Sequence, residues 1–188
     1  MGREFELKYQ ANPAVLEQIQ KDFSGFRTIT METTYYDTPD GTLGQLHWTV
    51  RRRLENGVSV CTVKTNLPDG SRGEWETEAD DVAEALPRLV SMGAPAALIA
   101  YCAQGLRPTC GARFTRKAAM VNAGRSELAL DSGVLLGGGK EEPLFEVEVE
   151  QKQGTDEETA RFAQTLARQY GLTPQPKSKL ARARALAE

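Results

Sequence analysis

The most regular pattern in the sequence is a strict alternation of charged and apolar positions. At the amino terminus, residues 4–9 read Glu-Phe-Glu-Leu-Lys-Tyr. Because successive side chains of a strand point to opposite faces, residues 3–10 are predicted to form a β-strand with one charged and one apolar face. Similar patterns predict further strands over residues 27–37, 46–54, 58–65, 72–79, 111–122, 125–131 and 144–152.

Helix signals interrupt this series of strands. Asn12-Pro13 and Asp80-Asp81 each precede apolar residues at helical spacing, and Thr155-x-x-Glu158 is a capping box that opens a helix ending at Gly171. Shorter helices are predicted over residues 95–104 and 178–186. Turn signals that join neighbouring strands occur at Pro39-Asp40-Gly41, Asn56-Gly57 and Pro68-Asp69-Gly70. This order predicts an α+β protein whose antiparallel strands form a sandwich or a closed barrel.

The charged strand faces are unusual because they carry clusters of like charge. Glu146, Glu148 and Glu150 follow one another on one face and repel each other unless a cation lies among them. The apolar faces, in turn, offer the helices a surface on which to pack. We therefore expect a barrel whose outer face is apolar and whose lumen is charged, with basic residues for an oligophosphate and carboxylates for Mg²⁺ or Mn²⁺.

Composition narrows the classes of function. The chain has 188 residues, of which 40% are hydrophobic, and a net charge of −3, which fits one domain over residues 1–188 without general attraction to nucleic acid or anionic lipid. No apolar run is long enough to span a bilayer, and the start lacks a secretory signal. The three cysteines show no metal-binding spacing, so reduced thiols in the cytoplasm are expected. His47 is the only histidine and is expected to lie at the surface or in packing, which leaves the chemistry to carboxylates, lysines and arginines.

Several blocks, in order along the chain, resemble the CYTH domain, also called the triphosphate tunnel metalloenzyme superfamily. Glu4-x-Glu6-x-Lys8 is similar to its ExExK signature, and the later blocks follow in sequence. They are 34–39, 48–53, Thr62-Val63-Lys64, Arg72-x-Glu74-x-Glu76, Phe114-Thr115-Arg116, 130–133, 145–150 and Lys177-Ser178-Lys179-x-x-Arg182. The resemblance covers nearly the whole chain.

The resemblance implies a closed eight-stranded antiparallel β-barrel, a tunnel flanked by helices, that binds a triphosphate with Mg²⁺ or Mn²⁺. It implies metal binding by Glu4, Glu6, Asp131, Glu146 and Glu148, although the alignment of Glu146, Glu148 and Glu150 is open. It implies phosphate binding by Lys8, Arg51, Arg53, Lys64, Arg116 and Lys179, and a catalytic role for Lys64, with Tyr35 as its partner. Arg52, Lys117 and Arg125 fall outside the charged pattern or the matched blocks and are expected to form surface salt bridges.

The resulting expectation is a metal-dependent hydrolase that cleaves the terminal phosphoanhydride of inorganic triphosphate. Thiamine triphosphatase and nucleoside triphosphatase are the first alternatives, followed by adenylate cyclase and by a non-catalytic module that binds polyphosphate or nucleotide. The expected partner is a small-molecule triphosphate rather than nucleic acid or a membrane, with the protein acting as a monomer or homodimer.

Overall fold

The computed structural model describes residues 2–67 and 70–188 of the chain. Pro68 and Asp69, which belong to the third predicted turn, lie outside this range. The elements are β1 (Gly2–Arg3), β2 (Glu6–Gln10), α1 (Pro13–Asp22), β3 (Arg27–Asp37), α2 (Thr42–Gln45), β4 (Thr49–Glu55), β5 (Val58–Asn66), β6 (Arg72–Glu78), α3 (Val82–Ser91), α4 (Ala97–Cys102), β7 (Arg107–Val121), the 3₁₀ turn η1 (Asn122–Gly124), β8 (Ser126–Gly137), β9 (Lys140–Gln151), α5 (Asp156–Tyr170), β10 (Thr173–Pro174) and α6 (Lys179–Ala185).

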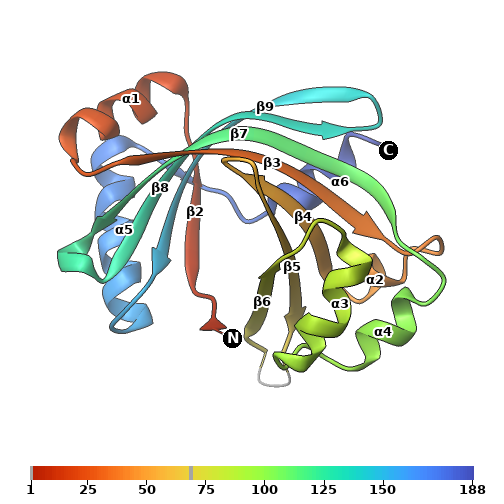
Figure 1. Ribbon diagram of the computed structural model, residues 1–188. Helices are drawn as coiled ribbons and strands as arrows, with labels where there is room; N and C mark the ends of the chain where they lie inside the picture. Colours follow the sequence, from red (N-terminus) through yellow and green to blue (C-terminus); the bar gives the residue numbers. More distant parts are fainter. Residues whose placement is uncertain (1, 68–69) are drawn as a thin grey trace.

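The strands form one antiparallel sheet with helices packed against it, which confirms the α+β class. The strand order is β1-β6-β5-β4-β3-β7-β8-β9-β2-β10, so the sheet has ten strands among the described residues. Figure 1 shows that the sheet is strongly curved, with α3 and α4 beside β4–β6 and with α1 and α5 at the opposite side.

The predicted closed eight-stranded barrel is not confirmed. The first predicted strand is split: Gly2–Arg3 pair with β6, whereas Glu6–Gln10 pair with β9. The last two residues of β2 pair on their other side with β10, through Thr173 opposite Gln10 and Pro174 opposite Tyr9. The chain itself links the two halves at the split, where Glu4 N–H donates to Arg72 O at 3.4 Å and Gln151 N–H donates to Phe5 O at 2.9 Å.

The apolar strand faces pack under the helices, as the alternation predicts. Val50, Val63 and Trp75 from β4–β6 form one buried cluster with residues of α3 and α4. Tyr9, Leu128 and Val147 represent a second cluster, built from β2, β8 and β9 together with α1 and α5. Burial of these two surfaces holds the curved sheet between its helices and leaves the charged positions on the opposite, inner face.

The inner face is not charged along its whole length. Met31, Phe114, Leu135 and Leu144 lie on it and form a third apolar cluster, into which α6 places Ala183. Figure 1 shows α6 within the curve of the sheet. Gly137 makes this approach possible, because a Cβ atom at that position would lie 2.0 Å from the carbonyl oxygen of Ala183. The carboxyl-terminal helix therefore fills one part of the concave side.

Two elements differ from the prediction. The short helix α2 was not predicted, and the strand predicted over residues 46–54 begins only at Thr49, after the turn that follows this helix. The hairpin of β8 and β9 is much longer than predicted, because pairing continues as far as Gly137 opposite Lys140. Among the described residues, no helix is long and apolar enough to cross a membrane. The three cysteines are free, and His47 is exposed outside the inner face.

Candidate functional site

A cavity of about 320 Å³ lies on the charged inner face of the sheet. Side chains from β2 to β9 and from the start of α6 line it, so residues far apart in the sequence meet there. Of the predicted site residues, Glu4, Glu6, Lys8, Tyr35, Arg51, Arg53, Lys64, Arg116, Glu148 and Lys179 line this cavity. Asp131 and Glu146 do not, and both are fully buried behind it.

Cations crowd one side of the cavity. Arg51 and Arg53 point inward from β4, and Arg116 points inward from β7. Burial and the neighbouring charges of Arg51 and Arg116 lower the pKa of Arg53 to about 10. Its hydrogen bonds are long, at 3.2 Å to Thr33 Oγ1 and 3.3 Å to Glu55 Oε1. An anion placed among these side chains would remove the repulsion between them.

Two of the arginines that line the cavity have buried donors without an acceptor among the described residues. The Nε atoms of Arg51 and Arg72 are buried and have no hydrogen-bond partner in residues 2–67 and 70–188. The guanidinium of Arg51 contacts Glu74 only at 3.4 Å. Because unpaired buried donors are costly, their presence at a cavity points to a ligand that accepts hydrogen bonds, such as phosphate.

Carboxylates crowd another side of the cavity. Glu4 and Glu6 meet Glu148 there, and Glu150 lies directly opposite Glu6 in the sheet. Burial, together with the negative charges of Glu148 and Glu4, raises the pKa of Glu6 to about 7, although Lys64 and Lys8 partly offset this effect. The ligand atoms in this group are oxygens, which suits Mg²⁺ or Mn²⁺, and a divalent cation would relieve their repulsion. The residues present therefore fit a metal ion of this type.

The predicted catalytic residues occupy different parts of the cavity wall. Lys64 Nζ donates to Glu4 Oε1 at 2.5 Å and lies 3.2 Å from Glu74 Oε2. Tyr35 is buried on β3 and lines the same cavity, opposite Arg51 of β4 in the sheet. Lys64 thus pairs with Glu4 and Glu74 in this structure, and its catalytic pairing with Tyr35 stays a prediction. Lys8 lies 3.6 Å from Glu6.

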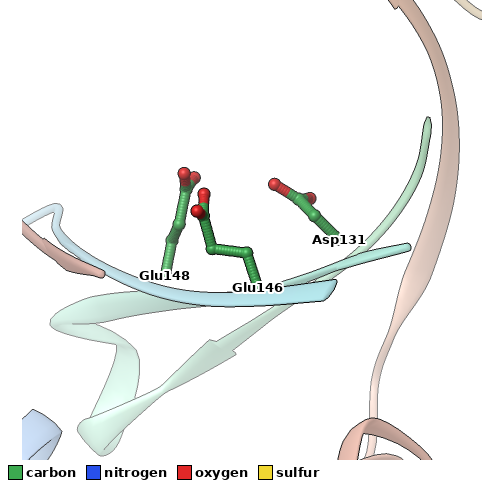
Figure 2. Close-up of side chains that lie close together, drawn as sticks. All are labelled: Asp131, Glu146 and Glu148. Atoms are coloured by element: carbon green, nitrogen blue, oxygen red, sulfur yellow. The ribbon is translucent and has the colours of Figure 1, made fainter. Parts of the chain in front are cut away.

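Behind the cavity, Asp131 of β8 and Glu146 and Glu148 of β9 bring their carboxylates together (Figure 2). One oxygen from each lies within 4.8 Å of the others, a grouping that can hold a metal ion. Three cations contact the group: Arg116 makes two parallel hydrogen bonds to Asp131, at 2.7 and 2.8 Å, Lys179 contacts all three carboxylates, and Arg182 contacts Glu146.

These contacts control the charge on Glu148. Burial alone would raise the pKa of Glu148, but Arg116 and Lys179 outweigh it and hold this pKa well below its usual value. Glu146 is bound by Arg182 of α6 in addition to Lys179. The carboxylate group behind the cavity is therefore fully ion-paired in this structure.

Sequence reasoning did not assign site roles to several residues that line the cavity. They are charged, and all but Lys152, which follows the end of β9, belong to inward-facing strand positions: Arg27, Glu55, Arg72, Glu74, Glu76, Glu127 and Lys152. The alternation itself would have identified most of them, had every inward position been taken as part of the site. Arg182 was also missed, because its partner Glu146 lies far from it in the sequence. Glu150, which the sequence left open as a metal ligand, also lines the cavity.

The three basic residues assigned to the surface lie outside the cavity lining. Arg125 forms the expected exposed salt bridge, at 2.6 Å from Glu158. Arg52 and Lys117 instead bind neutral side chains, Ser59 Oγ at 2.8 Å and Gln20 Oε1 at 2.5 Å.

Comparison with known proteins identifies relatives in sequence and in structure. Over 175 residues the chain is 26% identical to the inorganic triphosphatase of Haemophilus influenzae, and the match covers 88% of this chain and 50% of that protein. The chain thus spans about half the length of this curated relative. A Hippeastrum protein, described as a putative adenylyl cyclase with a dominant triphosphatase activity, has a similar structure, with a TM-score of 0.70, 19% identity, and coverage of 97% of this chain and 95% of the other.

A putative adenylate cyclase from Bacillus halodurans is also similar, with a TM-score of 0.68, 18% identity, and coverage of 95% and 96% of the two chains. At these identities the structural likeness supports the fold alone. The family model described as the CYTH domain matches residues 2–183, which is nearly the whole sequence. This protein therefore belongs to the CYTH domain family.

Proposed function

We propose that this chain is a metal-dependent triphosphatase that hydrolyses the terminal phosphoanhydride of inorganic triphosphate with Mg²⁺ or Mn²⁺. One observation carries the proposal: a single cavity contains both crowded cations and crowded carboxylates. The pKa of Arg53 is lowered to about 10 by burial, Arg51 and Arg116, while that of Glu6 is raised to about 7 by burial, Glu148 and Glu4. A triphosphate and a divalent cation, bound together, would relieve both kinds of repulsion.

The residues of this cavity have distinct proposed roles. Glu4, Glu6 and Glu148 would hold the metal ion, with Asp131 and Glu146 behind them, and the ion would neutralise charge on the phosphates. Arg51, Arg53, Arg116, Lys8 and Lys179 would bind phosphate oxygens. Lys64 would lie near the reacting phosphoryl group, with Tyr35 as its proposed partner. Phosphoryl transfer depends mainly on positioning and charge neutralisation, and these are the roles proposed for this set.

The cavity favours a substrate without a large organic group. Its volume is about 320 Å³, and Tyr35 is the one aromatic residue among the described residues that line it. A nucleobase or thiamine ring would need an apolar or aromatic surface on which to stack. The relative from Haemophilus influenzae, which is named an inorganic triphosphatase, supports the same substrate. We also propose that residues 1–188 act as one domain, in the cytoplasm, as a monomer or homodimer.

The test compares three substrates and then compares substitutions of two adjacent arginines, Arg51 and Arg52. The full chain, stripped of metal with EDTA, is incubated with tripolyphosphate, thiamine triphosphate or ATP, with Mg²⁺, Mn²⁺ or no metal. We expect phosphate release that is fastest from tripolyphosphate and that depends on added metal. Arg51→Gln should lower kcat/KM for tripolyphosphate by about 10²–10³-fold, the usual cost of losing one charge-stabilising donor.

Arg52→Gln is the matched control, because Arg52 points away from the cavity and bonds to Ser59. It should change kcat/KM by no more than about 2-fold, as expected for a residue outside the site. Equal losses in the two variants would contradict the proposed phosphate site. Cyclic AMP and pyrophosphate from ATP would identify a cyclase instead, and tight binding without turnover under every metal would identify a binding module.

A further inference from the structure

Lys179 stands between the cavity and the carboxylates behind it. It is the first residue of α6 and lines the cavity, yet its Nζ atom lies 2.8 Å from Asp131 Oδ2 and 2.6 Å from Glu148 Oε1, and it also contacts Glu146. Asp131 and Glu146 are fully buried and do not line the cavity. The ammonium group of Lys179 therefore contacts these two carboxylates from the side of the cavity.

The ammonium occupies the place where these carboxylates converge. The carboxylate oxygens of Asp131, Glu146 and Glu148 gather within 4.8 Å of one another, and Lys179 contacts every member of the group. A lysine ammonium is a compact point charge on a flexible four-carbon stem. One side chain thus pairs with all three carboxylates that a divalent cation would use.

The charges of the group explain why the two cations exclude each other. Three carboxylates are matched by three cations, Arg116, Lys179 and Arg182. A divalent ion that joined this set would leave it with two excess positive charges in a buried site, which is strongly unfavourable. The group can accept such an ion when Lys179 withdraws.

Helix α6 has other attachments that do not involve this group. Arg184 donates to Asp37 Oδ2 at 3.1 Å, and Gly137 leaves the space that the backbone of Ala183 occupies. The helix can therefore stay in place while the Lys179 side chain turns toward the cavity, where phosphate would lie.

We propose, building on the proposed function, that Lys179 is a tethered counter-ion that, in the metal-free protein, takes the place of a divalent cation among Asp131, Glu146 and Glu148, and that it transfers to phosphate when a metal ion binds there. Lys179 thereby weakens binding of the metal alone and favours binding of the metal together with triphosphate.

The first experiment measures the affinity for Mg²⁺ without any phosphate, by isothermal titration calorimetry on the full chain. Lys179→Met should bind Mg²⁺ at least about 10-fold more tightly than the wild type, since it removes the competing charge. Lys177→Met is the matched control: it removes the same charge two residues away, at an exposed position outside the cavity lining. It should leave the affinity within about 2-fold of the wild-type value.

Loss of Lys179 also leaves the buried carboxylates short of a cation, so the variant should have a lower Tm than the wild type in metal-free buffer. Mg²⁺ should then raise the Tm of Lys179→Met more than that of the wild type, because at a given concentration a ligand that binds the folded protein more tightly stabilises it more. Equal affinity of the variant and the wild type, including failure of both to bind, would overturn the proposal. An equal gain in Mg²⁺ affinity in Lys177→Met would also overturn the proposal.

A measurement on the wild type covers the case in which Lys179→Met does not fold. In protein labelled with ¹⁵N-lysine, the buried ammonium of Lys179 should give a signal protected from solvent exchange, identified by its absence in Lys179→Arg. Saturating Mg²⁺ should remove this protection, and an unchanged signal would refute the proposed transfer. Because no triphosphate is used, these results are separate from the proposed function, which fails only if the metal-loaded enzyme does not hydrolyse triphosphate.

Discussion

At the scale of single residues, the cavity is defined by charges that its own walls do not neutralise. Arg51 has a buried Nε donor without an acceptor, and Arg53 lies among other cations. Glu6 faces Glu4 and Glu148. A protein tolerates such arrangements where a ligand completes them, so stability and ligand binding should be linked at these residues.

The raised pKa of Glu6 determines whether stability rises or falls with pH. Burial, Glu148 and Glu4 raise the pKa of Glu6 from its ordinary value of 4.5 to about 7, against the opposing charges of Lys64 and Lys8. Between these values the folded protein holds a proton that the unfolded chain has released. The stability of the metal-free protein should therefore fall as the pH rises from about 4.5 to about 7.

Thermal unfolding in EDTA across this range measures the effect. In Glu6→Gln the Tm should fall less over this pH range than in the wild type. The difference should be roughly 2–4 °C for each kcal/mol of stability that the titration of Glu6 contributes. Part of the decrease should remain, because the pKa of Glu150 is also raised, first by burial. Glu142→Gln, at an exposed position of β9, should keep the wild-type profile. A Glu6→Gln profile as steep as that of the wild type would show that Glu6 is not the group responsible.

At the scale of elements, the sequence is informative where the signal is local. Asn12 caps α1 by accepting from Val15 N–H at 3.0 Å, and the capping box of α5 forms between Thr155 and Glu158 as predicted. Helix α2 was missed because it is a single turn whose N-cap, Gly41, has no side chain to accept a hydrogen bond. Residues before the N-cap accept instead: Thr38 Oγ1 accepts from Thr42 N–H, and the carboxylate of Asp37 accepts from Leu43 and Gly44.

The long hairpin of β8 and β9 was underestimated for a related reason. Its end is rich in glycine, which by itself indicates a loop. In the structure the glycines serve close packing instead: a Cβ atom on Gly133 would lie 2.1 Å from the carbonyl oxygen of Arg113, and Gly137 makes room for α6. These contacts join segments that the sequence separates, so the alternation pattern alone cannot show them.

The packing of α6 on Gly137 leads to a prediction about substrate binding. Gly137→Ala would place a methyl group against the backbone of Ala183, which cannot move away without moving the helix. We expect a loss of about 1–3 kcal/mol in stability, typical of overpacking, and a higher KM because Lys179 begins the same helix.

Thermal unfolding and steady-state kinetics on tripolyphosphate check both effects. Gly139→Asn is the control in the same turn, since Gly139 has a φ of +75° and no neighbouring atom within 4 Å of a Cβ. Asparagine tolerates this backbone conformation, so Tm and KM should change little. A lower Tm with an unchanged KM in Gly137→Ala would show that α6 does not set the position of Lys179.

At the scale of the whole molecule, alternation correctly predicted which strand faces α1, α3, α4 and α5 cover, but neither the packing of α6 on the inner face nor how the sheet ends. The closed eight-stranded barrel is not confirmed, because the first strand changes partner between Arg3 and Glu6 and β10 pairs with the end of β2. Neither feature changes the local alternation of charged and apolar residues, so the sequence pattern could not predict it. The curved sheet still brings β4, with its arginines, and β9, with its glutamates, to one cavity, although three strands separate them in the sheet.

This arrangement predicts cooperative binding of the two proposed ligands. The arginines repel one another until an anion binds, the glutamates do so until a cation binds, and the two ligands attract each other within the same cavity. A methylene-bridged analogue of triphosphate, which resists hydrolysis, should therefore raise the affinity for Mg²⁺ by about 5–150-fold, the usual range for coupled sites. Calorimetry with and without the analogue measures this, after allowance for the complex that metal and analogue form in solution. Arg53→Gln should reduce the coupling, because it weakens the site for the anion and leaves the carboxylates intact. Independent binding of the two ligands in the wild type would mean that the two charged regions do not act as one site.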